Sequence, residues 1–113
     1  MSDRSMRSAP VALTEELLAS IPVSTGIYEV LDADGTVVDI GIAGGRSTFG
    51  LRGVLRDWLA EHSDRPWTVR WEVATVYLPR WHELLMDAVV ETGALPAMVS
   101  ERGVRPPGRL TPR

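Results

Sequence analysis

The chain has 113 residues with 12 basic and 15 acidic side chains, which gives a formal net charge of −3. This length fits one compact domain, and 44% hydrophobic with 24% charged residues excludes a chain that is disordered throughout. No apolar run approaches the roughly 20 residues that span a bilayer, and residues 1–10 lack the apolar core of a signal peptide. We therefore expect a cytoplasmic protein with no membrane partner.

The residue types that are missing exclude several chemistries. The chain has no Cys, so disulfides, thiol nucleophiles and thiolate metal sites are excluded. All 12 basic residues are Arg, and Lys, Asn and Gln are absent, a bias that fits a GC-rich bacterial genome. Schiff-base catalysis by Lys, P-loop phosphate binding and bidentate amide recognition of adenine are excluded as well.

The N-terminal half predicts a short helix followed by a β-hairpin. Residues 1–12 show no periodicity and predict a flexible arm. A Thr at the start of residues 14–20 can cap a helix whose first turn is acidic. Residues 26–31 predict a strand, the Asp-Ala-Asp-Gly sequence of residues 32–35 predicts a turn, and residues 36–40 predict the returning strand.

The C-terminal half predicts two helices that flank one strand. Apolar residues recur at helical spacing over residues 49–62, after a glycine-rich loop that begins at Gly41. Residues 67–77 alternate as in a strand. A second long helix is expected from Pro79 to Gly93.

The predicted elements give an α+β fold, with helices packed on a three-stranded antiparallel sheet made of a β-hairpin and one further strand. We expect the domain to cover residues 13–101. The Pro- and Arg-rich segment of residues 102–113 predicts a flexible tail.

Three short motifs carry most of the functional information. Gly26-Ile27-Tyr28 is followed by Asp39-Ile40-Gly41, and Leu51-Arg52 then opens a helix. This pattern resembles the GIY-YIG nuclease superfamily, whose signature is two tripeptides on a hairpin and an Arg on the next helix. The resemblance covers roughly residues 24–99 and implies a small GIY-YIG-like domain.

The resemblance also implies roles for particular side chains. It makes Tyr28 a residue that helps to deprotonate water and Arg52 a residue that steadies a phosphate, while a helix carboxylate holds one divalent metal, Mg²⁺ or Mn²⁺. A planar, permanently charged guanidinium suits phosphate or carboxylate, and a nearby cation can lower the pKa of a phenol. The alternatives are a core-facing aromatic ring for Tyr28 and a solvated helix residue for Arg52.

The acidic partner has two candidates on the second long helix. Glu83, Asp87 and Glu91 are spaced four residues apart, which places them on one helix face. Counting back from Pro96 in the family pattern puts the metal ligand at Asp87, and Glu83 is the alternative if the register shifts by one turn. A solvent-facing polar stripe is the competing interpretation.

Three positions depart from the family pattern. Asp39 replaces the Tyr of the second motif, Arg56 replaces the aromatic or His residue one turn after Arg52, and Val99 occupies the position of an Asn. The loss of the Tyr puts ordinary nuclease chemistry in doubt. A carboxylate at position 39 could instead pair with Arg52, bind a metal or act as a general base.

Other residues give weaker signals. The glycine-rich loop leads into a helix N-terminus, where free N–H groups together with Arg46 and Arg56 could bind an anion. His62 and His82 lack the spacing of metal ligands and are expected at the surface. The four Trp residues are expected mostly in the core rather than on a nucleic-acid stacking platform: Trp58, Trp67, Trp71 and Trp81.

Three functions remain open from the sequence. The favoured one is an altered GIY-YIG site that binds or acts on a small anionic or polar metabolite, with acid–base or hydrolytic chemistry by Tyr28, Asp39, Arg52 and Glu83. The second is a metal-dependent DNA endonuclease. The third is an inactive interaction module. The negative net charge and the added Asp39 disfavour DNA because both repel phosphate.

Overall fold

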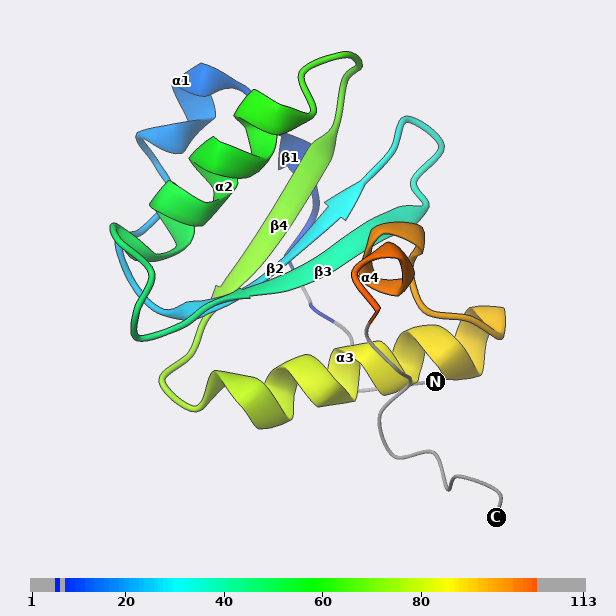
Figure 1. Ribbon diagram of the computed structural model, residues 1–113. Coiled ribbons are helices and arrows are strands. Elements are labelled where there is room, and N and C mark those ends of the chain that lie inside the picture. The colour runs from blue at the N-terminus through cyan, green and yellow to red at the C-terminus, as the bar shows by residue number, and fades with distance from the viewer. Residues whose placement is uncertain (1–5, 7, 104–113) are drawn as a thin grey trace.

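The computed structural model describes residue 6 and residues 8–103, which form an antiparallel sheet between two layers of helices (Figure 1). In this part of the chain the sheet has four strands in the order β1-β4-β2-β3: β1 (Val11–Ala12), β2 (Gly26–Leu31), β3 (Val37–Ala43) and β4 (Thr68–Val73). The helices are α1 (Glu15–Leu18), α2 (Gly50–Glu61), α3 (Tyr77–Thr92) and α4 (Ala97–Glu101). The α+β class predicted from the sequence is confirmed.

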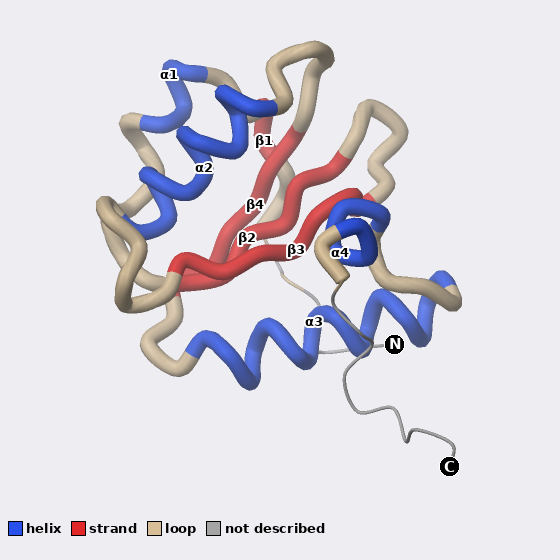
Figure 2. The backbone as a smooth tube through the Cα atoms, in the orientation of Figure 1, coloured by secondary structure: helices blue, strands red, loops and turns tan. Residues whose placement is uncertain are grey.

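Each face of the sheet carries its own hydrophobic core. Helices α1 and α2 cover one face and α3 covers the other, while α4 lies beside the edge strand β3 (Figure 2). Side chains alternate between faces along a strand, so Tyr28 and Val30 of β2 join the α2 core, whereas Ile27 joins the α3 core. The same alternation sends Ile40 of β3 toward α3.

The hairpin forms where the sequence predicts it. Strand β2 has the predicted bounds, and the Asp32 carboxylate accepts hydrogen bonds from the backbone N–H groups of Asp34 and Thr36. Gly35 adopts a φ of 83°, which favours Gly. Strand β3 continues to Ala43, three residues beyond the predicted end, because Gly41 and Ala43 still pair with Tyr28 and Gly26.

Helices α2 and α3 also match the predicted periodicity. Helix α2 buries Leu51, Leu55 and Trp58 against the sheet. Helix α3 begins at Tyr77, two residues before Pro79. Pro is accepted in the first turn of a helix because the N–H groups of that turn have no partner within the helix. It ends at Thr92, and Gly93, the predicted stop, follows as the C-cap with a φ of 85°.

Three elements correct the sequence interpretation. Strand β4 ends at Val73, four residues before the predicted end, and Tyr77 begins α3 instead of ending the strand. The sheet gains a fourth strand, β1, where a flexible arm was expected, because Val11 and Ala12 pair with Val69 and Thr68 of β4. Two residues are too few to show a periodicity. Helix α4 forms after Pro96, where no regular structure was expected, and it buries Val99.

The predicted tail begins at Arg102, which the structure describes in contact with the domain, while residues 104–113 of that tail and residues 1–5 and 7 of the predicted arm lie outside the described residues. None of the helices in the described part of the chain is long and apolar enough to cross a bilayer.

Candidate functional site

A cavity of about 550 Å³ opens between α2, α4 and the hairpin, on the α2 side of strand β3. Aromatic side chains from three elements line it, and four charged side chains lie around them. The aromatic residues are Tyr28, Trp58, His62 and Trp81, and the charged residues are Asp57, Glu61, Glu101 and Arg102. Tyr28 is therefore the predicted catalytic residue that faces this cavity.

Tyr28 is only 5% exposed, yet its hydroxyl is available to a ligand. Among the described residues, no side chain or backbone group accepts a hydrogen bond from this hydroxyl, and Tyr28 is one of the residues that line the cavity. Burial, followed by the negative charge of Asp39, raises the pKa of Tyr28 above its ordinary value. The hydroxyl consequently keeps its proton at neutral pH and acts as a donor.

The last residue of the second motif, Gly41, is a glycine for a steric reason. A Cβ atom added at this position would collide with the hydroxyl and ring of Tyr28. The two residues are directly opposite each other in the β2–β3 pairing. The glycine therefore lets the Tyr28 ring lie flat across the neighbouring strand and reach the cavity.

Asp39 is fully buried and contacts two residues that line the cavity, Trp58 and Arg102. Arg102 donates to both carboxylate oxygens, at 2.7 Å to Oδ1 and 3.2 Å to Oδ2, and the Trp58 indole N–H donates to Oδ2 at 2.7 Å. Hydrogen bonding to Asp39, and then the negative charge of Asp39, raise the pKa of Arg102. Of the roles predicted for Asp39, the structure shows an ion pair, with Arg102 in place of Arg52.

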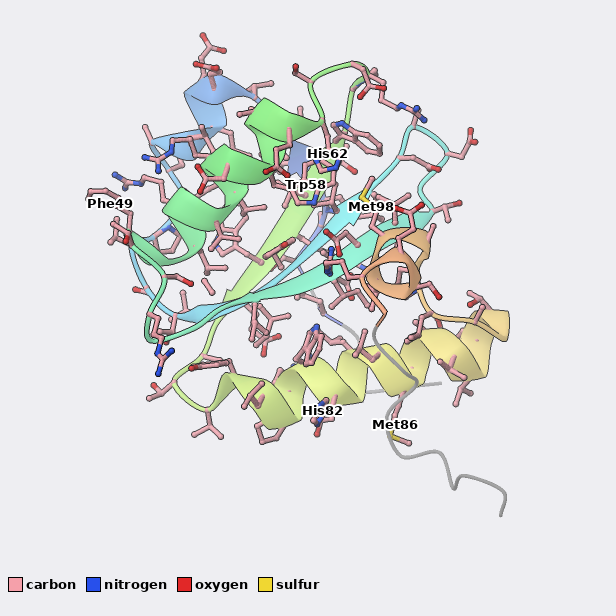
Figure 3. All side chains as sticks on the ribbon, viewed as in Figure 1. Phe49, Trp58, His62, His82, Met86 and Met98 are labelled. Carbon is pink, nitrogen blue, oxygen red and sulfur yellow. The ribbon has the colours of Figure 1, made fainter. Side chains whose placement is uncertain are left out.

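His62 lines the cavity, although the sequence places it among surface residues. Its ring stacks on Trp58 with centroids 4.2 Å apart, and its Nδ1 lies 2.9 Å from the Trp58 carbonyl oxygen. A carbonyl oxygen only accepts, so Nδ1 is the donor in this contact. Trp58 and His62 lie on the side of α2 that faces Met98 of α4, whereas His82 is exposed on the outer side of α3 (Figure 3).

Arg52 does not join Tyr28. Its Nε donates to the carbonyl oxygen of Ile21 at 2.8 Å, and its Nη2 donates to that of Ala19 at 3.2 Å. These carbonyl groups follow the end of α1, where helix C-termini attract cations. Arg52 therefore ties α1 to α2, on a side of α2 that the cavity does not touch.

Glu83 and Asp87 belong to α3, which covers the opposite face of the sheet from Tyr28. Glu83 pairs with Arg80 at 2.9 Å, and Asp87 lines a separate cavity. No group of three or more His, Asp or Glu side chains within the described residues could hold a metal ion. The predicted ligands Glu83 and Asp87 therefore do not fit a shared Mg²⁺ or Mn²⁺ site with Tyr28.

The predicted anion site at the start of α2 has its N–H groups occupied. Those of Gly50, Leu51 and Arg52 donate to the carbonyl oxygens of Ser47, Ser24 and Pro22. In the preceding loop, the Gly44 N–H donates to the Ser47 hydroxyl and the Gly45 N–H donates to that of Tyr77.

The side chains predicted to accompany that anion site do not converge either. Arg46 is exposed on the loop, and Arg56 lies over the Phe49 ring and beside Asp57.

The sequence was compared with family models, curated proteins and solved structures. A family model described as a domain of unknown function, DUF7508, matches residues 6–92. The chain belongs to this family. No curated protein and no solved structure matches the chain. The matched part of the DUF7508 domain includes Tyr28, Asp39 and the aromatic residues of the cavity, while α4 and Arg102 follow it.

Most of the charged and aromatic residues that line the cavity of this DUF7508 domain were not predicted as site residues from the sequence, and His62 and Arg102 are two of them. The spacing of Trp58 and His62, four residues apart on a predicted helix, was a usable signal for the stacked pair. Arg102 had no such signal, because it meets Asp39 across 63 positions of sequence.

Proposed function

We propose that this chain is a GIY-YIG-like domain whose altered site binds a small polar molecule in the cavity above Gly41, with Tyr28 as the hydrogen-bond donor. The observation that carries the proposal is the Tyr28 hydroxyl, which is nearly buried, unpartnered among the described residues and open to a cavity of about 550 Å³. Pockets of this size with a few placed polar groups are typical of small-molecule sites. The order hairpin, helix, strand, helix and the placement of both tripeptides on the hairpin support the GIY-YIG-like scaffold.

The charges around the cavity favour a small molecule over DNA. Three carboxylates line it, and its guanidinium, Arg102, is already paired with Asp39. Binding of a DNA backbone needs several cations that replace counterions. Arg52 donates to the carbonyl groups of Ala19 and Ile21, which follow α1, instead of facing Tyr28, and this removes the phosphate contact that the family resemblance implies.

Tyr28 and His62 could serve acid–base chemistry on the bound molecule. Tyr28 keeps its proton and could hold a substrate oxygen by a hydrogen bond, and His62 is the imidazole that lines the same cavity and could transfer a proton. Such a pair suits chemistry in which one group polarises the substrate and the other moves a proton. This chemistry is part of the proposal, and its residues are Tyr28 and His62 rather than Arg52 and Glu83.

A ligand screen by NMR tests the proposal. The full chain is titrated with a library of small polar metabolites, and we expect hits that shift the indole N–H signals of Trp58 and Trp81. Tyr28→Phe keeps the ring and should weaken those hits about fivefold to tenfold, since it removes one hydrogen bond. Tyr77→Phe is the matched control, because the Tyr77 hydroxyl binds the Gly45 N–H outside the cavity.

A plasmid-nicking assay in Mg²⁺ or Mn²⁺ tests the competing function. If the wild type cuts the plasmid, Tyr28→Phe does not, and the ligand screen gives no hit, the nuclease function replaces the small-molecule proposal. Hits that Tyr28→Phe and Tyr77→Phe weaken equally would place the ligand elsewhere on the domain.

A further inference from the structure

The charge around the Tyr28 cavity indicates which kind of molecule it takes. Asp57 and Glu61 lie four residues apart on α2 and line the cavity together, and Glu101 lines it from α4. Glu61 is also close enough to Tyr28 for its negative charge to raise the pKa of that hydroxyl. The carboxylates therefore surround the free donor from two helices.

The positively charged side chain that lines the cavity, Arg102, is already paired with a carboxylate. Arg102 forms a two-bond ion pair with the fully buried Asp39, and the pair has no net charge. Among residues 8–103, the remaining carboxylates of the cavity have one ion pair, and it is weak. Asp57 has a contact of 3.5 Å to its neighbour Arg56, and both side chains are more than half exposed. An anion entering this cavity would meet like charge, and a cation would meet opposite charge.

The aromatic side chains fit the same ligand. The indole N–H groups of Trp58 and Trp81 donate to Asp39 and to the Ile40 carbonyl oxygen, so these rings offer the cavity aromatic surface rather than further donors. Aromatic surface attracts organic cations through its electron-rich faces. The Tyr28 hydroxyl, which remains a donor, needs an acceptor atom on the same ligand.

We infer that the cavity binds a small organic cation, an amine that also carries a hydrogen-bond acceptor, with the ammonium near Asp57 and Glu61 and the acceptor at Tyr28. This inference rests on the proposed function and specifies its ligand. It reverses the charge expected from the sequence, where Arg52, Arg46 and Arg56 suggested an anion. In the structure these three side chains do not line the cavity.

Three four-carbon alcohols whose second end group is positive, neutral or negative test the inference on the full chain: 4-amino-1-butanol, 1,4-butanediol and 4-hydroxybutyrate. We expect the amino alcohol to bind in the millimolar range and to shift the Trp58 and Trp81 indole signals. The diol should bind more weakly, and 4-hydroxybutyrate should not bind. Added salt should weaken the binding of the amino alcohol and leave the binding of the diol unchanged.

Two charge-removing variants locate the cation. Glu61→Gln keeps the shape of the side chain and removes its charge. We expect it to weaken binding of the amino alcohol about fivefold, the effect of one charge near the surface, and to leave binding of the diol unaffected. Glu16→Gln on α1 makes the same change in net charge away from the cavity and should have no effect. Equal weakening by both variants would overturn the inference, because only the overall charge of the protein would then matter.

The outcomes separate the inference from the proposed function. If 4-hydroxybutyrate binds in a way that depends on Tyr28 and the amino alcohol does not bind, the inference of a cationic ligand is overturned. The proposal of a small-molecule site at Tyr28 then still stands. Failure of all three probes would also overturn the inference, and the proposed function would then be decided by the wider ligand screen.

Discussion

Arg102 and Asp39 form an ion pair that closes the C-terminal end of the described fold onto the sheet. The carboxylate is fully buried on β3, and the guanidinium, which is 47% exposed, follows α4. The Trp58 N–H shares one of the carboxylate oxygens, so α2, α4 and β3 meet at this group. The pair thereby holds the two helices that line the Tyr28 cavity at a fixed distance from each other.

Removing Arg102 should destabilise the domain. Arg102→Ala leaves the Asp39 charge buried with Trp58 as its remaining partner, and we expect a loss of about 2 kcal/mol in the free energy of unfolding, below the 3–5 kcal/mol of fully buried pairs because Arg102 is half exposed. Urea unfolding measures this. Arg46→Ala, on the exposed loop, is the control and should change stability by less than about 0.5 kcal/mol. Equal effects of the two variants would show that the ion pair does not hold the fold.

The sequence predicts the local elements of this fold well, for a physical reason. The hairpin, α2, α3 and the stop at Gly93 follow from periodicity and turn chemistry within a few residues of sequence. Strand β1 and the Arg102–Asp39 pair depend instead on partners that lie 55 or more positions away in the chain. No spacing rule marks such partners.

The candidate site divides in the same way. Tyr28 and Gly41 face each other because the hairpin brings them together, and the tripeptides mark that hairpin. Arg52 lies on the predicted helix. Its hydrogen bonds depend on which side of that helix α1 packs against, and the sequence does not show this. Glu83 and Asp87 were placed on one helix face correctly, yet which face of the sheet α3 covers depends on the tertiary packing.

The Tyr28 hydroxyl should resist deprotonation. Because burial raises its pKa above the ordinary 10.0, the folded state holds this proton more tightly than the unfolded state does. The stabilising effect is fully present below pH 10 and is lost as the pH rises toward the folded pKa. The free energy of unfolding of the wild type should therefore fall relative to that of Tyr28→Phe as the pH rises above about 10.

The Tyr77→Phe variant allows Tyr28 to be followed alone, since the chain has two Tyr residues. In this variant we expect no tyrosinate absorbance until the pH is well above 10, or until the protein unfolds. Tyrosinate that appears below pH 10 in the folded variant would show that the hydroxyl is not shielded from solvent.

Arg52 should stabilise the fold without contributing to binding in the cavity. Arg52→Ala removes two charge-assisted bonds to the carbonyl groups of Ile21 and Ala19, and we expect a loss of about 1–2 kcal/mol in the free energy of unfolding. The affinity for cavity ligands, measured by NMR titration, should stay within about twofold. A stable Arg52→Ala variant that loses ligand binding would restore the phosphate- or anion-binding role implied by the GIY-YIG resemblance.

Gly41 and Tyr28 should be coupled in stability. Gly41→Ala places a methyl group where the Tyr28 hydroxyl and ring now lie, so we expect it to cost about 1–3 kcal/mol in the wild type. On a Tyr28→Ala background the same substitution meets no ring and should cost less than about 0.5 kcal/mol. The four proteins of this double-mutant cycle are compared by urea unfolding. Equal costs on both backgrounds would mean that the glycine serves the β3 backbone itself, and that the position of Tyr28 over the strand does not depend on it.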